Sequence, residues 1–159
     1  MVRVFTPLHR GGSGSPLLLL HGFTGTWRAW DLVLPALERR HDVLAPTLAG
    51  HAGGPALNGN LSDSVLADHV EQAMDQAGFE TAHIAGNSLG GRIALEAAAD
   101  GLVGSATTLS PAAFWWGAPD FVYVRTVFTW LTTSANLMAP IVPRLARSPR
   151  ARRVMGAMV

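Results

Sequence analysis

The spacing of apolar and polar residues along the chain predicts strands that alternate with helices. Short apolar runs predict buried strands over residues 16–20 and 81–85, and two further strands are predicted over residues 41–45 and 103–109. Apolar positions three or four residues apart, or alanine-rich runs without proline, predict helices over residues 27–40, 62–77 and 89–99. Such an alternation is typical of an α/β fold, in which a doubly wound, mostly parallel sheet carries helices on both faces.

The same pattern predicts which positions face the core. One face of the helix at 27–40 would comprise Trp30, Val33, Leu34 and Leu37. The next helix, capped by Ser62 or Ser64, has an apolar stripe of Val65, Leu66, His69, Val70, Ala73, Met74 and Ala77. Weak alternation over residues 2–8, followed by the glycine- and serine-rich cluster 10–15, predicts a hairpin that leads into the first buried strand.

The chain changes character after Pro111, so we expect an α/β core over residues 1–111 and a different region over 112–159. Residues 121–142 are mostly apolar but irregular. They include Arg125, several threonines and Pro140, which argues against a membrane-spanning helix. Residues 121–159 carry six arginines and no acid, whereas residues 1–120 carry six arginines and eleven acids.

Composition limits the class of protein. Of 159 residues, 48% are hydrophobic and 14% charged, which is typical of a globular domain with a core. The absence of cysteine excludes disulfides and thiolate metal sites. Residues 1–7 lack the apolar core of a signal peptide, so we expect a cytoplasmic location. The arginine cluster at 144–153 has no interleaved aromatic residues, so we expect no nucleic-acid partner and no stable membrane insertion.

A short motif gives the first indication of chemistry. Gly86, Asn87, Ser88, Leu89 and Gly90 form the pattern Gly-x-Ser-x-Gly between a predicted strand and a predicted helix. In this setting the pattern is a nucleophile elbow, a cramped turn that exposes a serine and leaves no room for side chains at the glycines. The alternative is that Ser88 only caps the helix that follows it.

A second motif lies about sixty-five residues upstream. The apolar run at 16–20 ends in His21-Gly22-Phe23-Thr24-Gly25. A buried strand with this ending, paired with a serine elbow, resembles the α/β-hydrolase superfamily. The loop Gly50-His51-Ala52-Gly53 also resembles the Gly-His-Gly loop of that family.

The resemblance implies roles for individual residues. Ser88 would be the nucleophile, and the backbone amides of Phe23 and Leu89 would form the oxyanion hole. His21 and Gly22 would border the substrate. In the family, residues 112–159 correspond to the start of a helical cap, in which Trp115 and Trp116 would either line the substrate pocket or pack in a core.

The histidine and the acid of the family's triad do not follow Ser88 in the usual order. The six histidines, at positions 9, 21, 41, 51, 69 and 83, all precede it. His51 is the best placed of them to replace the missing base, although a structural role in its loop is the simpler interpretation. Asp120 is a candidate for the acid. Because the family's last strands carry the acid and histidine, we expect this chain to be the N-terminal portion of a longer hydrolase.

The sequence therefore predicts a serine hydrolase that acts on an ester or a similar small acyl compound, with no cofactor and no metal. The family's dehalogenase and epoxide hydrolase branches use an Asp nucleophile, which Ser88 disfavours. Two alternatives stay open. One is a non-catalytic binding or accessory protein on the same fold. The other is a lyase: His21-Gly-Phe-Thr-Gly25 together with Gly90-Gly91-Arg92 resembles the menaquinone-synthase branch. The oligomeric state is left open.

Overall fold

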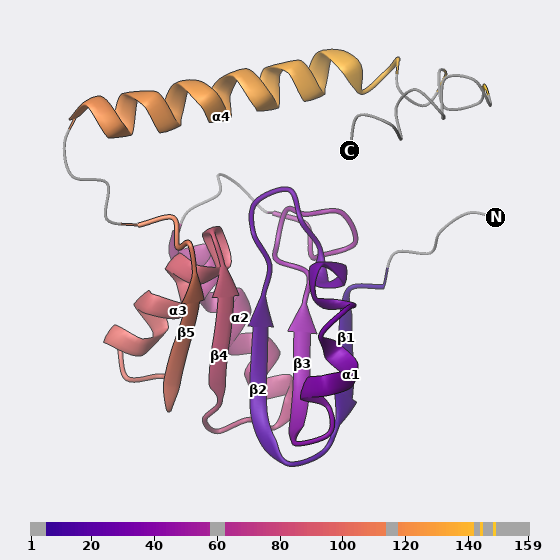
Figure 1. The fold of residues 1–159 in the computed structure, drawn as a ribbon, viewed down its shortest axis with the longest axis vertical. Helices are drawn as coiled ribbons and strands as arrows, with labels where there is room; N and C mark the ends of the chain where they lie inside the picture. The colour runs from indigo at the N-terminus through magenta and orange to yellow at the C-terminus, as the bar shows by residue number, and fades with distance from the viewer. Residues whose placement is uncertain (1–5, 58–62, 114–117, 142–143, 145–147, 149–159) are drawn as a thin grey trace. The chain divides into compact units, whose positions relative to one another are not determined.

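A five-stranded sheet forms the centre of the computed structural model, which describes residues 6–57, 63–113, 118–141, 144 and 148. Its strands are β1 (Leu8–Gly12), β2 (Ser15–Leu20), β3 (His41–Pro46), β4 (His83–Asn87) and β5 (Ser105–Leu109). They lie in the order β1-β3-β2-β4-β5, and all pairs are parallel except β1 with β3 (Figure 1). The mostly parallel α/β sheet predicted from the sequence is therefore confirmed.

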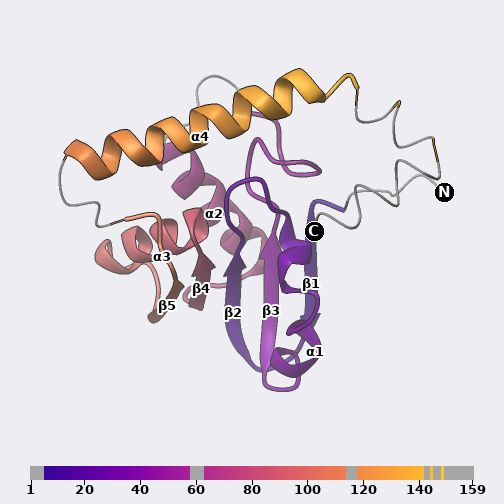
Figure 2. The same ribbon diagram turned by 45° about the horizontal axis from the view of Figure 1, so that its top comes forward.

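Helices cover both faces of this sheet, as Figures 1 and 2 show. On one face, α2 (Asp63–Ala77) and α3 (Leu89–Ala99) form the larger core cluster with the strands. On the other, the 3₁₀ turn η1 (Trp27–Trp30) and the single-turn helix α1 (Leu34–Leu37) form a smaller cluster. Because both faces are packed, the central strands are almost continuously apolar, and Leu17–Leu20 are buried one after another.

Helix α2 follows the predicted amphipathic pattern. Leu66, Val70 and Met74 are buried in the larger core cluster, whereas Glu71 and Asp75 are exposed. The 3.6-residue period places these two sets on opposite sides of the helix. Ser62 lies outside the described residues, so the structure does not describe the predicted cap there.

The predicted helix over residues 27–40 is wrong. The segment instead forms η1 and α1, and Val33, which was predicted on the buried face, is 43% exposed. Pro35 lies at the start of α1. A proline has no N–H to donate and its ring collides with the carbonyl four residues earlier, so it can begin a helix but cannot continue one. The apolar residues do have helical spacing, but the backbone does not form one continuous helix through Pro35.

The first hairpin also differs from the prediction. The strand is Leu8–Gly12 rather than residues 2–8, and it pairs with β3 rather than with β2. Gly12 (φ 81°) ends β1 and Gly14 (φ 126°) lies in the connection from β1 to β2, both close to the segment that precedes β3. A Cβ on Gly12 would lie 2.7 Å from Glu38 Cα. The glycines thus allow the chain to cross from one side of β3 to the other. The sequence pattern does not show that β3 lies between β1 and β2.

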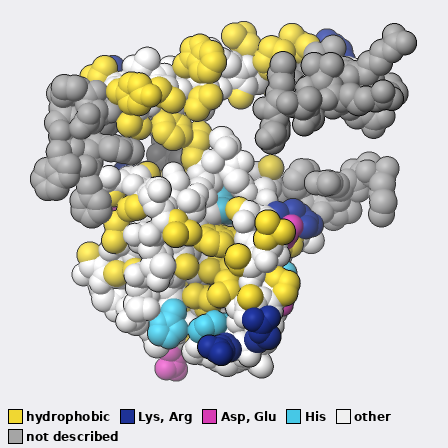
Figure 3. Space-filling model, in the orientation of Figure 1, with side chains coloured by type: hydrophobic (Ala, Val, Ile, Leu, Met, Phe, Trp, Pro, Cys, Tyr) yellow, Lys and Arg dark blue, Asp and Glu magenta, His cyan; other side chains and the backbone are white. Residues whose placement is uncertain are grey.

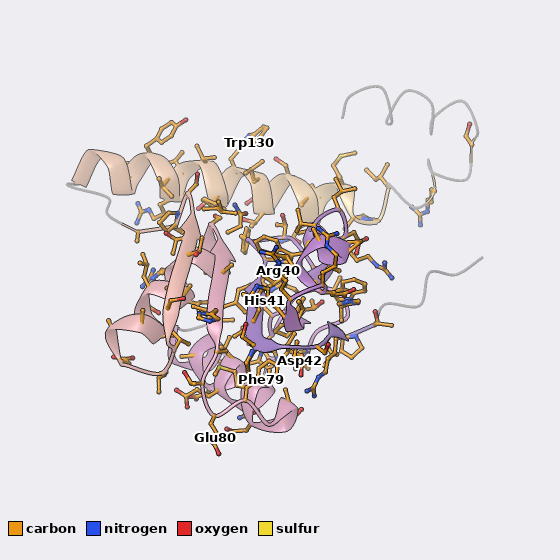
Figure 4. The ribbon with its side chains drawn as sticks, turned by 60° about the horizontal axis from the view of Figure 1, so that its bottom comes forward. Arg40, His41, Asp42, Phe79, Glu80 and Trp130 are labelled. Carbon is orange, nitrogen blue, oxygen red and sulfur yellow. The ribbon has the colours of Figure 1, made fainter. Side chains whose placement is uncertain are left out.

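The amino-terminal edge of the sheet carries a network of charged and aromatic side chains. Arg10 donates to both carboxylate oxygens of Asp42, at 3.3 and 2.9 Å, and its guanidinium lies 5.3 Å from the ring centre of Phe79. Figure 4 shows Asp42 and Phe79 close together at this edge. These hydrogen bonds join β1 to β3.

Residues 114–159 form a second compact unit, separate from residues 1–113. Its main element is α4 (Ala118–Met138), a single helix of 21 residues where the sequence indicated an irregular segment. The hydroxyls of Thr126 and Thr132 donate to carbonyls one turn earlier, which accommodates polar residues in the helix. Hydrophobic side chains gather on its surface (Figure 3), and Trp130 is 68% exposed. Among the described residues, no helix is both long and apolar enough to cross a membrane.

Candidate active site

Ser88 lies in a strained turn between the end of β4 and the start of α3. Its backbone angles are φ 51° and ψ −110°, a region that residues with a side chain rarely adopt. The turn is held by backbone hydrogen bonds from both sides. Ser88 N donates to Leu109 O at 2.9 Å, and Ser88 O accepts from Arg92 N and Ala112 N at 3.0 and 2.9 Å. Such strain persists only where the surrounding structure fixes it, and it clusters at functional sites.

The glycines of the motif make this turn possible. A Cβ on Gly86 would lie 2.6 Å from Gly91 N, and a Cβ on Gly90 would lie 2.7 Å from His21 O. Both distances are shorter than any real contact of a Cβ, and both partners are backbone atoms. The elbow therefore sits directly against the end of β2, which brings Ser88 to the loop that follows this strand.

The loop after β2 forms a β-turn beside the serine. Gly25 N donates to Gly22 O at 3.0 Å, and Thr24 has φ 63°. A Cβ on Gly22 would lie 3.3 Å from Ser88 Cβ, so this glycine packs on the serine. Leu89 is the first residue of α3, and the first amides of a helix have no partner within it. The amides of Phe23 and Leu89 thus belong to the two segments that flank Ser88.

His21 is completely buried beneath this loop and has a hydrogen-bond partner at each ring nitrogen. Its Nδ1 lies 2.7 Å from Gly22 O, and Leu48 N donates to its Nε2 at 2.9 Å. Since Nε2 accepts, the proton is on Nδ1 and the ring is neutral. Burial lowers the pKa of His21 below its ordinary value. These contacts leave neither nitrogen available to act as a base toward Ser88.

Burial of neutral His21 predicts acid sensitivity. Below about pH 6.5 the unfolded chain takes up a proton on this ring, whereas the folded protein resists it because its pKa is lowered. The free energy of unfolding is therefore expected to fall as the pH drops below about 6.5, by at most about 1.4 kcal/mol per pH unit for one group. Urea unfolding of the chain between pH 7.5 and 5 measures this slope.

His21→Asn is expected to reduce that slope, and His83→Asn, which changes an exposed histidine, is the control. Burial also lowers the pKa of His69, so part of the slope remains in the His21 variant. Identical slopes for the parent and His21→Asn would contradict the assignment of a buried neutral His21.

His51, the upstream histidine considered as a replacement base, packs under the same loop. Its ring lies edge-on to His21 and Phe23, with ring centres 4.9 and 6.0 Å apart, and its Nδ1 is 3.1 Å from Ala49 O. Its Nε2 is buried without a hydrogen-bond partner. No hydrogen bond in the described part of the chain joins a histidine to the Ser88 side chain.

The remaining histidines have other surroundings. His41 and His83 each share a hydrogen bond with a serine hydroxyl, at 2.8 Å in both cases, and His9 pairs with Glu38. His69 lies half-buried on α2, and its Nδ1 has no hydrogen-bond partner.

Other residues proposed from the sequence have definite places. Asn87 Nδ2 donates to Leu109 O at 3.3 Å, at the end of the same strand as the elbow. The guanidinium of Arg92 pairs with Glu96, one turn further along α3, with Nε 2.9 Å from Oε1. Trp115 and Trp116 lie outside the described residues. Asp120 belongs to α4, but its side chain is outside the described part.

The structure adds one segment that the sequence analysis missed. The residues after β5 support the elbow from its other side, because Ala112 N binds Ser88 O and a Cβ on Gly91 would lie 3.1 Å from Pro111 Cα. Ser110 there has φ 45°. The Ser-Pro pair that follows the last predicted strand was the available signal, since it marks a sharp turn at a strand end.

Comparisons with known proteins give the family to which this fold belongs. Residues 15–144 match the family model described as alpha/beta hydrolase fold. The 2-hydroxymuconate semialdehyde hydrolase of Pseudomonas sp. (strain CF600) is 32% identical over 151 residues, which cover 84% of this chain and 53% of that protein. An epoxide hydrolase of Mycobacterium tuberculosis is 51% identical over 55 residues, 35% of this chain and 26% of that protein.

A solved structure shares the architecture. A variant of a meta-cleavage product hydrolase superposes with a TM-score of 0.62 at 32% identity, covering 69% of this chain and 42% of that one. The chain thus spans about half the length, or less, of these similar proteins. The match to the family model extends over most of the chain, and the chain belongs to the alpha/beta hydrolase fold family.

Proposed function

We propose that the complete protein is a serine hydrolase, with Ser88 as its nucleophile and a small ester or related acyl compound as its substrate. The observation that carries the proposal is the backbone of Ser88. A serine at φ 51°, fixed between a strand and a helix and packed on Gly22, is costly to the fold and typical of a nucleophile elbow.

The reaction follows from the residues around the turn. Ser88 Oγ attacks the carbonyl carbon of the substrate, its proton passes to a base, and the carbonyl oxygen becomes an oxyanion. The amides of Phe23 and Leu89 stabilise that charge, and the collapse of the tetrahedral intermediate releases the leaving group and forms an acyl-enzyme. Water then releases the acid.

In this proposal the base comes from a segment outside these 159 residues. His21 is occupied at both ring nitrogens, and the contacts described for His51 join it to Ala49, His21 and Phe23 rather than to Ser88. Asp120 stays a candidate for the acid.

Three observations favour a carbonyl substrate over the alternatives. The relative that matches over most of this chain is named for a semialdehyde, which is a carbonyl compound. The arginine that would suggest a lyase acting on an acidic substrate, Arg92, is paired with Glu96. A serine at the elbow also fits acyl chemistry better than opening of an epoxide by a carboxylate.

A fluorophosphonate probe tests the proposal on the complete protein. It forms a covalent bond only with an activated serine, so we expect stoichiometric labelling on the peptide that contains Ser88 and no labelling of Ser88→Ala. Mass spectrometry of the digested protein locates the label. Absence of labelling in a folded complete protein would refute the proposed function.

A further inference from the structure

We propose that His21 is a positioning residue that fixes the direction of the Phe23 N–H in the oxyanion hole, through the peptide bond between Gly22 and Phe23. This inference rests on the proposed function and deepens it, because it assigns a specific role to a histidine that cannot act as the base. The family resemblance supplies only the position of the amide. The role of the imidazole comes from its hydrogen bonds.

The peptide between Gly22 and Phe23 is held by its oxygen. Gly22 O accepts from His21 Nδ1 at 2.7 Å and from Gly25 N at 3.0 Å. A peptide unit is planar, and in the trans form its C=O and N–H point in opposite directions; the described backbone contains no cis bond. Two donors on Gly22 O therefore set the direction of the Phe23 N–H on the opposite side of the same plane.

The proton that holds this peptide is itself fixed. Leu48 N donates to His21 Nε2 at 2.9 Å, which requires a lone pair there and places the proton on Nδ1. Leu48 belongs to the loop after β3, so a neighbouring loop selects the tautomer that binds Gly22 O. The ring is fully buried, and burial lowers the pKa of His21, which keeps it neutral.

The surroundings of the ring leave little freedom. His51, a titratable group, lies edge-on against it, with ring centres 4.9 Å apart. A Cβ on Gly25 would lie 3.1 Å from His21 Nδ1, so the turn closes tightly over the imidazole. Because Gly22 also packs on Ser88, a rotation of this peptide would move the amide relative to the reacting carbonyl.

Two substitutions of His21 distinguish the hydrogen bond at Nδ1 from the hydrogen bond at Nε2. The side-chain amide of asparagine overlays the Nδ1 half of histidine, so His21→Asn keeps a donor for Gly22 O and loses the acceptor for Leu48 N. Glutamine reaches the position of Nε2, so His21→Gln keeps an acceptor for Leu48 N and loses the donor for Gly22 O. Each variant removes one buried hydrogen bond, and the two are expected to lose similar stability.

Hydrolysis of p-nitrophenyl acetate by the complete protein tests the inference. Because a misdirected oxyanion donor raises the barrier to attack, we expect His21→Gln to lower kcat about 10- to 100-fold with little change in KM. His21→Asn keeps the positioning donor and is expected to retain at least about 5-fold more of the parent kcat than His21→Gln does. Equal losses of kcat in both variants, at equal stability in urea, would overturn the inference.

A spectroscopic measurement that does not depend on catalysis tests the role of His21 separately from the proposed function of Ser88. Nitrogen-15 spectra of His21 at pH 7 are expected to show a protonated Nδ1 and an unprotonated Nε2. The opposite tautomer would overturn the inference even if Ser88 is labelled by a fluorophosphonate. If Ser88 is not labelled, the proposed function fails, and with it the catalytic part of the inference, whatever the tautomer of His21.

Discussion

Replacing Ser88 with alanine is expected to lower kcat of the complete protein by about 10⁴- to 10⁶-fold, as removal of a serine nucleophile does in other hydrolases. Only the attacking oxygen is lost. The hydrogen bonds that hold the elbow use the backbone N and O of Ser88, and alanine keeps both. We therefore expect a folded protein with an unchanged circular dichroism spectrum, and we would measure initial rates with p-nitrophenyl acetate.

Ser110→Ala is the matched control for this experiment. Ser110 also has a left-handed backbone (φ 45°), lies at the end of the neighbouring strand and is exposed, so the same atoms are removed in a similar setting. Its rate is expected to stay within about 3-fold of the parent. An unchanged rate in Ser88→Ala would show that Ser88 is not the nucleophile, and no hydrolysis by the folded parent protein would support the alternative of a non-catalytic protein.

The second large effect is expected at Gly90. Gly90→Ala places a methyl group 2.7 Å from His21 O and even closer to Leu20 O, at the end of a central strand. These backbone atoms are fixed by the sheet, so the overlap cannot be relieved by moving a side chain. We expect the free energy of unfolding to fall by about 4 kcal/mol or more, the range of severe overpacking. Urea unfolding followed by tryptophan fluorescence measures the change.

Gly104→Ala provides the comparison. A Cβ there would lie 3.7 Å from Thr81 Oγ1, an ordinary contact, and Gly104 is not among the residues with positive φ. We expect a change of less than about 1 kcal/mol, as for alanine at a glycine position that it fits. Equal unfolding midpoints for the two variants would show that the elbow does not pack against β2 as the structure has it.

The spacing of apolar residues within a single strand or helix correctly predicted buried residues in β2 and α2. The run Leu17–Leu20 is buried as predicted, and so are Leu66, Val70 and Met74 of the α2 stripe, because burial on one face or two follows directly from period and composition. The prediction was wrong where a single residue changed the backbone or the path of the chain. Pro35 interrupted the helix over 27–40, and Gly12 and Gly14 carried the first strand past β2 to pair with β3.

The sequence by itself determined the fold class, the turn at Ser88 and the two segments that flank it, because each depends on residues that are close together along the chain. Only the tertiary structure decided what His21 does. Its two partners, Gly22 and Leu48, are one and 27 residues away along the chain, and the second becomes a neighbour only when β2 and β3 pair. A histidine read from the sequence is a potential base. In the folded protein, hydrogen bonds at both nitrogens make it a fixed neutral donor, because burial leaves no water to take their place.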